Sequence, residues 1–123
     1  MMKVMTDLAA RRCVPCEGGE PPLSREPAER LRGMVARWEL DEHARSIRRT
    51  FRFTTFKEGI AFVNDVADVA EAEGHHPDIT IRYLRVTFTL TTHAIGGLSE
   101  NDFIMAAKID QVYATRPAGA TPA

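Results

Sequence analysis

The chain has 123 residues, which suits one domain built around one hydrophobic core. Apolar residues make up 44% and charged residues 27%, as in an ordinary globular protein, and the formal net charge is −1. This balance gives no electrostatic reason to expect a nucleic acid or an anionic membrane as the main partner. No apolar run approaches the ~20 residues of a membrane helix, and the N-terminus lacks the apolar centre of a signal peptide, so we expect a cytoplasmic protein.

Residues 1–23 are predicted to form a flexible N-terminal arm, because the stretch after Cys13 is rich in proline and glycine. Cys13 and Cys16 are the only cysteines, so no disulfide framework is needed to explain the fold. Their spacing could supply half of a zinc site, but the sequence has no second pair of cysteines to complete it. The glycines and prolines that follow argue against a redox pair at the start of a helix. We assign the arm no role.

Residues 24–114 are predicted to form the folded domain, which begins with a helix. Ser24 is a suitable N-cap, and Pro27 lies in the first turn, where its missing N–H costs little. Residues 38–53 have the pattern of a hairpin with a polar turn at residues 41–44. Its second strand alternates strictly, with one face formed by Ile47, Arg49, Phe51 and Phe53.

A long helix is predicted from Thr55, which forms a capping box with Glu58, to about residue 73. Gly74 suits the left-handed position that ends a helix. The apolar stripe on this helix is wide enough to predict burial on two sides, against its own sheet and against another subunit. Glu71 lies four residues after Ala67 and is therefore expected on the buried edge. The stripe consists of Phe56, Ile60, Val63, Ala67 and Ala70, widened by Phe62, Val66 and Val69.

The remaining residues predict a second hairpin at 79–92 and a last helix that begins after a capping box at Ser99. Residues 115–123 are expected to be a disordered tail. The order is therefore helix, strand, strand, helix, strand, strand, helix. Strands paired in hairpins imply an antiparallel sheet, and helices gathered on one face of it give an α+β domain.

Three histidines and two carboxylates are the candidate site residues. Imidazoles titrate near neutral pH, so neighbouring histidines can supply a proton donor and a proton acceptor together. Pro77 restricts His76 to extended geometry, so His75 and His76 are expected to point to opposite sides. Glu71 is expected to orient His75, and Asp102 to cap the last helix. His93 is expected to leave the second hairpin on its polar face.

These residues leave acid–base catalysis, a metal site and purely structural histidines open as alternatives. Three histidines can bind zinc, but two adjacent histidines with a third seventeen residues later is not a common ligand spacing. No serine or cysteine nucleophile lies beside them, and the chain has no glycine-rich phosphate loop. The pattern favours acid–base chemistry.

The motifs as a set resemble the pterin-4a-carbinolamine dehydratases, also called 4a-hydroxytetrahydrobiopterin dehydratases. The resemblance covers about residues 23–113, and Trp38 and the phenylalanines of residues 51–56 fall where the family has them. The matching pattern runs Glu71-x-x-x-His75-His76-Pro77, then Tyr83, His93 and Gly97-Leu-Ser-Glu-x-Asp102.

The resemblance implies an α+β fold with a four-stranded antiparallel sheet, three helices on one side, and assembly into homodimers or homotetramers. It implies a hydro-lyase that dehydrates the 4a-hydroxytetrahydropterin left by aromatic amino acid hydroxylases, giving the quinonoid dihydropterin and recycling that cofactor. That reaction needs no metal and no cofactor. A non-catalytic pterin-binding or regulatory oligomer of the same fold is the alternative.

Carried over by motif, the resemblance implies that the three histidines are catalytic, with His75 near the pterin N5 and His76 or His93 as the proton donor. The residues implied to contact or orient the substrate are Glu71, Pro77, Asp102 and Trp38. Two departures are visible. Residues Ile79 and Thr80 stand where animal members carry aromatic side chains, and the N-terminal arm is an addition to them.

Overall fold

The computed structural model describes residues 8–15 and 18–116. The predictions for residues 1–7, for Cys16 and for residues 117–123 of the tail lie outside the described residues. Within the described part, no helix is long and apolar enough to cross a membrane.

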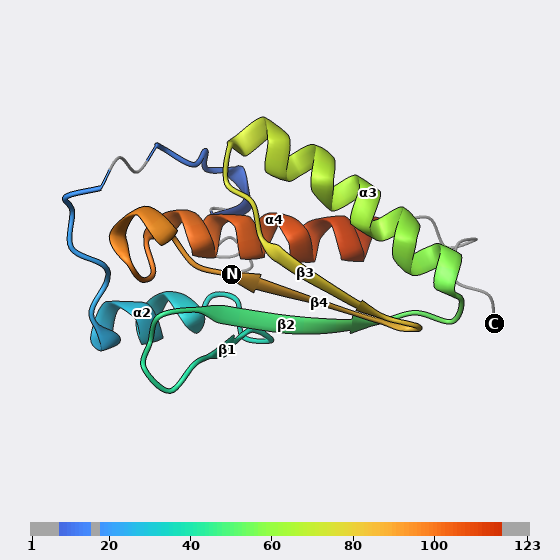
Figure 1. The fold of residues 1–123 in the computed structure, drawn as a ribbon, viewed down its shortest axis with the longest axis horizontal. Helices are drawn as coiled ribbons and strands as arrows, with labels where there is room; N and C mark the ends of the chain where they lie inside the picture. The colour runs from blue at the N-terminus through green and yellow to red at the C-terminus, as the bar shows by residue number, and fades with distance from the viewer. Residues whose placement is uncertain (1–7, 16–17, 117–123) are drawn as a thin grey trace.

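A four-stranded antiparallel sheet forms one layer of the molecule, in the strand order β1-β2-β4-β3 (Figure 1). The inner strands are β2 (Ile47–Arg52) and β4 (Arg85–Leu90), and the edge strands are β1 (Glu39–Leu40) and β3 (Asp78–Arg82). The register pairs Phe51 with Val86, so the apolar side chains of both inner strands share one face. The predicted α+β class and the alternation in the second strand are confirmed.

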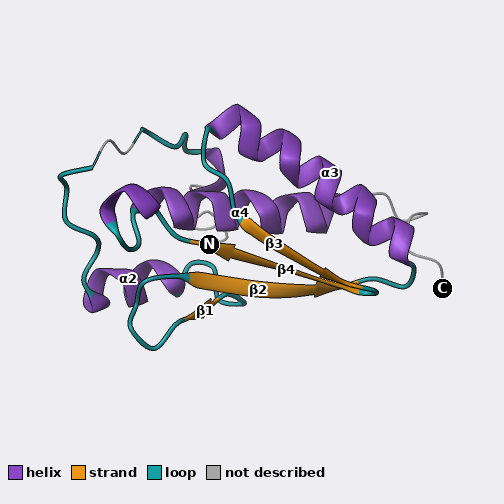
Figure 2. Cartoon of the chain, in the orientation of Figure 1, coloured by secondary structure: helices purple, strands orange, loops and turns teal. Residues whose placement is uncertain are grey.

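The helices form the second layer on the apolar face of the sheet (Figure 2). They are α2 (Arg25–Arg32), α3 (Phe56–Glu73) and α4 (Glu100–Thr115), and a 3₁₀ turn, η1 (His93–Ile95), leads into the last of them. Both halves of the predicted capping box of α3 are present, with Thr55 Oγ1 accepting from the Glu58 backbone N–H at 3.1 Å. Residues 8–10 are also helical, a segment that the sequence did not predict.

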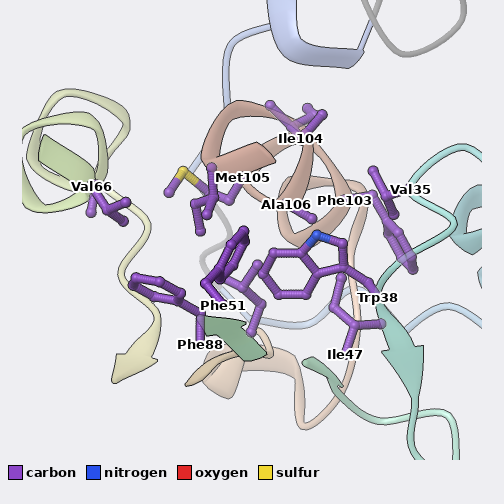
Figure 3. Packing of buried hydrophobic residues seen from close by; sticks show 14 of the residues in the cluster. Val35, Trp38, Ile47, Phe51, Val66, Phe88, Phe103, Ile104, Met105 and Ala106 are labelled. Atoms are coloured by element: carbon purple, nitrogen blue, oxygen red, sulfur yellow. The ribbon is translucent and has the colours of Figure 1, made fainter. Parts of the chain in front are cut away.

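The core lies between the sheet and helices α3 and α4 (Figure 3). Phe51 of β2 packs against Phe62 of α3 and Phe88 of β4, with ring centroids 5.0 and 5.7 Å apart. Trp38 closes the cluster from the side of β1 and is 1% exposed. Because α4 is buried along most of its length, it is the central helix of the layer.

Helix α3 buries a narrower face than its apolar stripe suggested. Phe62, Val66 and Ala70 are buried in the core, whereas Phe56 is 47% exposed. Glu71 also lies on the exposed side, with 77% of its side chain accessible, so its predicted place on the buried edge is wrong. The buried face is centred on Phe62 and Val66, which only widened the predicted stripe, and not on the residues that formed its middle. Ala67, the reference for the expected position of Glu71, is itself exposed.

Residues 8–15, the described part of the N-terminal segment, are docked on the domain, and the flexibility expected of the arm stays a prediction. Leu8 is 1% exposed and belongs to the hydrophobic core. Further along, the backbone N–H of Leu23 donates to the carbonyl of Leu98 at 2.8 Å. The glycines and prolines indicated an irregular backbone correctly, but they did not exclude packing of that backbone against the fold.

Candidate active site

All three candidate histidines line one cavity of about 410 Å³. Its volume lies within the range of about 300–1,000 Å³ that is usual for small-molecule sites. The cavity lies where the end of α3, the turn η1, the start of α4 and the N-terminal segment meet. Its lining residues are Cys13, Val14, Pro15, Glu73, Gly74, His75, His76, Thr91, Thr92, His93, Ala94 and Asn101.

His75 is placed by the end of α3. Gly74 adopts the left-handed conformation, with φ 67°, and stops the helix as predicted. The backbone N–H groups of Gly74 and His75 both donate to the carbonyl of Ala70, at 2.9 and 3.2 Å. These two bonds fix the direction in which the chain leaves the helix, and therefore the position of the imidazole that follows.

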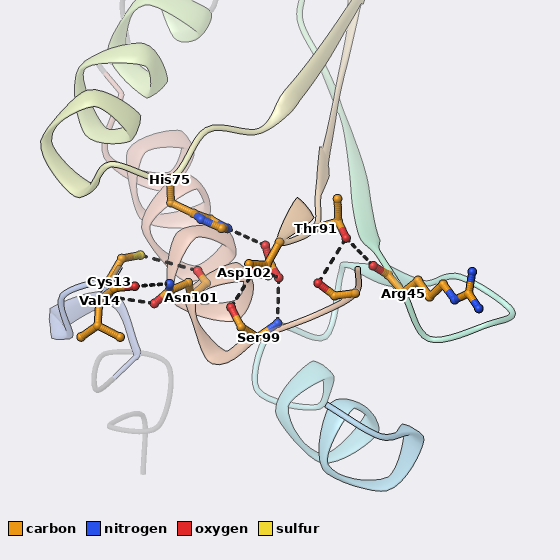
Figure 4. Close-up of polar contacts among 10 residues, drawn as sticks. Cys13, Val14, Arg45, His75, Thr91, Ser99, Asn101 and Asp102 are labelled. Carbon is orange, nitrogen blue, oxygen red and sulfur yellow. Dashed lines mark hydrogen bonds and ion pairs between the residues drawn. The ribbon is translucent and has the colours of Figure 1, made fainter. Parts of the chain in front are cut away.

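The imidazole of His75 meets Asp102 of α4 (Figure 4). Its Nε2 lies 2.6 Å from Asp102 Oδ1, with the histidine side chain 12% exposed and the aspartate fully buried. The other carboxylate oxygen accepts from Thr92 Oγ1 at 2.8 Å and from the backbone N–H of Ser99 at 3.0 Å. Asp102 therefore caps α4, as predicted, and also orients a histidine.

His76 has a different carboxylate partner. Its Nε2 lies 2.6 Å from Glu71 Oε2, and the two side chains are 58% and 77% exposed. The sequence paired Glu71 with His75, and the structure corrects that assignment. The histidines have separate partners because the extended backbone before Pro77 sends successive side chains to opposite sides.

The two carboxylates determine which imidazole nitrogens remain available. An ionised carboxylate can only accept hydrogen bonds, so the His75 Nε2 that faces Asp102 carries a proton in the neutral ring. Its Nδ1 then presents a lone pair. The same arrangement at Glu71 leaves Nδ1 of His76 as the second free ring nitrogen. Each carboxylate also stabilises the positive charge that its imidazole gains on protonation.

His93 follows the end of β4 rather than lying on it, because the strand ends at Leu90 and His93 begins the turn η1. The turn closes at Gly96, whose φ of 73° is in the left-handed region. The exposed His93 still lines the cavity together with His75 and His76. His93 was expected to leave the second hairpin on its polar face, and in the structure it is instead the first residue of the turn η1.

Trp38 lies in the core instead of lining this cavity. Its Nε1–H donates to Asp110 Oδ1 at 2.8 Å, and Arg49 Nη1 contacts the same oxygen at 2.7 Å. Burial raises the pKa of the Asp110 carboxyl, although these two donors act in the opposite direction. The three side chains join α4 to the sheet, so Trp38 has a structural place here.

Glu73, Cys13 and Asn101 line the cavity, and sequence reasoning singled out none of them as part of a site with the histidines. Burial acts to raise the pKa of Glu73, but the Cys13 backbone N–H together with Lys108 and Arg12 lowers it overall. Burial and the neighbouring Glu73 raise the pKa of the Cys13 thiol to about 12. The thiol therefore stays protonated near neutral pH, which makes it a poor nucleophile.

No group of three His, Cys, Asp or Glu side chains within residues 8–15 and 18–116 is arranged to hold a metal ion. His75 and His76 are instead each engaged by one carboxylate. The geometry of the described residues is that of two separate carboxylate–imidazole pairs beside a third imidazole.

Comparison with known proteins identifies similar chains. The family model described as pterin 4 alpha carbinolamine dehydratase matches residues 21–112. A protein of Methylococcus capsulatus named "Putative pterin-4-alpha-carbinolamine dehydratase" is 54% identical over 109 residues, 87% of this chain and 94% of the relative. A protein of Rubrobacter xylanophilus with the same name is 49% identical over 109 residues, 88% of this chain and all of the relative.

Solved structures share the fold. A Brucella melitensis protein described as a transcriptional coactivator/pterin dehydratase superposes with a TM-score of 0.70 and 30% identity, over 74% of this chain and 97% of that chain. A pterin dehydratase-like protein described as a RuBisCO assembly factor in the alpha-carboxysome gives a TM-score of 0.53 and 24% identity, over 61% of this chain and 87% of that one. At that identity the second likeness shows the fold alone.

Proposed function

Because the chain belongs to the pterin 4 alpha carbinolamine dehydratase family, we propose that it converts a 4a-hydroxytetrahydropterin into the quinonoid dihydropterin and water. The observation that carries the proposal is the cavity itself, in which three histidines converge and one of them is held by a buried carboxylate. Such a substrate is left by aromatic amino acid hydroxylases, so the reaction would regenerate a spent pterin cofactor.

In the proposed reaction His75 is the base. Its Nδ1 takes the proton from the pterin N5, and the electron pair of that N–H bond forms the double bond between N5 and C4a. The imidazolium that results is stabilised by Asp102, which lies 2.6 Å from Nε2 and is shielded from water. This division of roles follows the logic of a carboxylate that orients a histidine and stabilises its charge.

His76 is the proposed acid. A protonated His76 donates to the 4a hydroxyl, the C4a–O bond breaks, and the oxygen leaves as water. Glu71 stabilises the charged form of this imidazole before the transfer. The proton gained at His75 and the proton lost at His76 balance, so one proton exchange with solvent resets the site. The proposed chemistry requires neither a metal nor an organic cofactor.

Stopped-flow absorbance with a synthetic 4a-hydroxytetrahydropterin tests the proposal, because the substrate also dehydrates in buffer and supplies its own reference rate. The wild-type chain is expected to accelerate the decay in proportion to its concentration. His76→Ala and His93→Ala are expected to lower that acceleration, with the larger loss for His76→Ala. Decay at the buffer rate with wild-type protein would contradict a dehydratase.

A non-catalytic pterin-binding or regulatory role remains the alternative, since a shared fold does not fix function. The carboxylate–imidazole pairs favour catalysis, because a binding site alone does not require two oriented proton-transfer groups. Tight binding of a stable 7,8-dihydropterin by a chain that leaves the decay rate unchanged would support the alternative instead.

We also propose that the working form is a homo-oligomer. Helix α3 leaves the apolar side chains of Phe56, Ile60 and Val63 exposed or only half-buried. The edge strand β3 exposes Ile79 and Ile81, at 37% and 40%. An apolar helix flank and an open sheet edge are both surfaces that a second copy of the chain would cover.

A further inference from the structure

The N-terminal segment at residues 8–15 lies outside residues 21–112, where the family model matches, yet three of its residues line the cavity with the histidines. Cys13, Val14 and Pro15 form a wall of that cavity. Val14 is 64% exposed, which is high for an apolar side chain beside a candidate site. A ligand that filled the cavity would contact this wall.

The segment is anchored first to the end of α3. The backbone N–H of Cys13 donates to Glu73 Oε1 at 2.8 Å, and Arg12 Nε lies 3.4 Å from Glu73 Oε2. Lys108 of α4 lies 3.5 Å from the same oxygen and donates to the carbonyl of Ala9 at 2.6 Å. The side chains of Glu73 and Lys108 are only 8% and 15% exposed, so their contact is largely shielded from water, whereas Arg12 is 77% exposed.

The second anchor is the start of α4 (Figure 4). Asn101 Oδ1 accepts from the backbone N–H of Val14 at 3.0 Å, and its Nδ2 donates to the Val14 carbonyl at 2.6 Å. The amide thus pairs with one residue of backbone as a strand neighbour would. Asn101 is 3% exposed, so both bonds lie away from competing water.

The two anchors flank the catalytic pair. Glu73 lies two residues before His75, and Asn101 directly precedes Asp102. The segment therefore connects the C-terminal end of α3 to the N-terminal end of α4. The distance between these two helix ends sets the 2.6 Å contact between His75 and Asp102. Resting on the proposed function, we propose that residues 8–15 are a positioning element of the active site, held by Asn101, and that their wall binds the pterin.

Asn101→Ala tests this directly, with Cys16→Ser as the common background so that Cys13 is the one thiol. Removal of the amide is expected to release Val14 and to speed alkylation of Cys13 by iodoacetamide, because the half-buried thiol becomes accessible. For the dehydration we expect kcat to fall about tenfold as the pair loses alignment, and KM to rise as the wall loosens.

Arg48→Ala is the control, since Arg48 belongs to β2, pairs with the exposed Glu39 and does not line the cavity of the histidines. It is expected to leave alkylation, kcat and KM unchanged. If Asn101→Ala does not fold, as judged by circular dichroism, Val14→Pro removes the same N–H donor from the segment without altering α4 and is expected to behave alike.

Three outcomes would overturn the inference. The first is unchanged alkylation of Cys13 in the folded variants, which would mean that Asn101 does not hold the segment. The second is faster alkylation with kcat and KM as in the parent. The third is an NMR result that does not depend on activity. If the parent shows no dehydration, the proposed function fails, and the positioning role is then tested by the imidazole NMR signals of His75. Signals at the same positions in the parent and in Asn101→Ala would refute that role.

Discussion

At the residue scale, the carboxylates of the two histidine pairs differ most in burial. Asp102 is fully buried and accepts from three donors, whereas Glu71 is 77% exposed. A charge interaction is stronger where water is excluded. The two pairs therefore differ in how much each carboxylate can contribute to proton transfer.

Asp102→Asn is accordingly expected to lower kcat by roughly 10²-fold or more, because the amide cannot stabilise the imidazolium and no longer favours the proton on Nε2 of His75. Glu71→Gln is the matched change at the exposed pair and is expected to cost less than about tenfold. Steady-state kinetics of both variants check the order. A larger loss for Glu71→Gln would reverse the assignment of base and acid.

Substitution of Trp38 tests whether this residue has a structural role or a substrate-binding role. Trp38→Phe keeps an aromatic ring in the core but removes the donor to Asp110, so we expect a loss of about 1–2 kcal/mol in the free energy of unfolding. The kcat and KM of the folded protein should change by less than about twofold. Urea unfolding and stopped-flow assays measure the two effects. A raised KM at unchanged stability would restore the role that the resemblance implied.

At the residue scale, local spacing was enough to single out the three histidines that line one cavity and the Asp102 that contacts His75, while their catalytic roles stay predictions. Sequence reasoning paired Glu71 with the wrong histidine because the apolar stripe, from which the rotation of α3 about its axis was inferred, is wider than the buried face. It missed Glu73 and Asn101 because their partners are distant in sequence: backbone groups of residues 13 and 14 and, for Glu73, also the side chains of Arg12 and Lys108. No local pattern reveals such long-range contacts.

At the element scale, the site depends on how α3 ends. Gly74 has a φ of 67°, and no neighbouring atom lies within 4 Å of the position that a Cβ would occupy, so a substitution there strains the backbone without causing a clash. Gly74→Ala is expected to cost about 1 kcal/mol of stability. Gly74→Asn should cost less, because asparagine tolerates the left-handed region. Thermal unfolding of wild type and the two variants measures these differences. Equal stability of Gly74→Ala and wild type would contradict the role of Gly74 as a left-handed C-cap.

The ionisation of Glu73, at the end of α3, makes the stability of the fold depend on pH. Its pKa is lowered in the folded state from 4.5, so ionised Glu73 contributes stability above about pH 4.5 that is lost as the pH falls through the lowered value. Glu73→Gln removes that contribution. We therefore expect wild type to be the more stable at neutral pH, with the difference shrinking in acid. Urea unfolding between pH 7 and about pH 3 tests it. A constant difference would contradict the assignment.

At the scale of the whole molecule, the element order and the sheet could be predicted because hairpins, capping boxes and a terminal glycine are local signals. Docking of residues 8–15 could not be predicted, since Leu8 is the one fully buried core residue among them, with Ala9 and Cys13 partly buried against the core, and the polar contacts are with distant residues. The exposed apolar flank of α3 is the side that its stripe predicted to be buried against another subunit, and that burial stays a prediction. In the proposed oligomer, that side belongs to contacts between chains.

The proposed oligomer should depend on this flank. Phe56→Asp places a charge on a side chain that is 47% exposed in the single chain, and light scattering after gel filtration should show a smaller assembly than wild type. Val14→Asp, a change of the same kind on another exposed apolar residue, should leave the mass unchanged. A monomeric wild type at micromolar concentration would contradict the proposal.

The most direct test of the account is the rate at which 4a-hydroxytetrahydropterin decays with wild type, with His75→Ala and in buffer, followed by stopped-flow absorbance. Wild type is expected to accelerate the decay, and His75→Ala is expected to lose about 10²–10⁴-fold of that acceleration while remaining folded. Equal rates for wild type and His75→Ala, or a wild-type rate equal to that of buffer, would contradict this expectation.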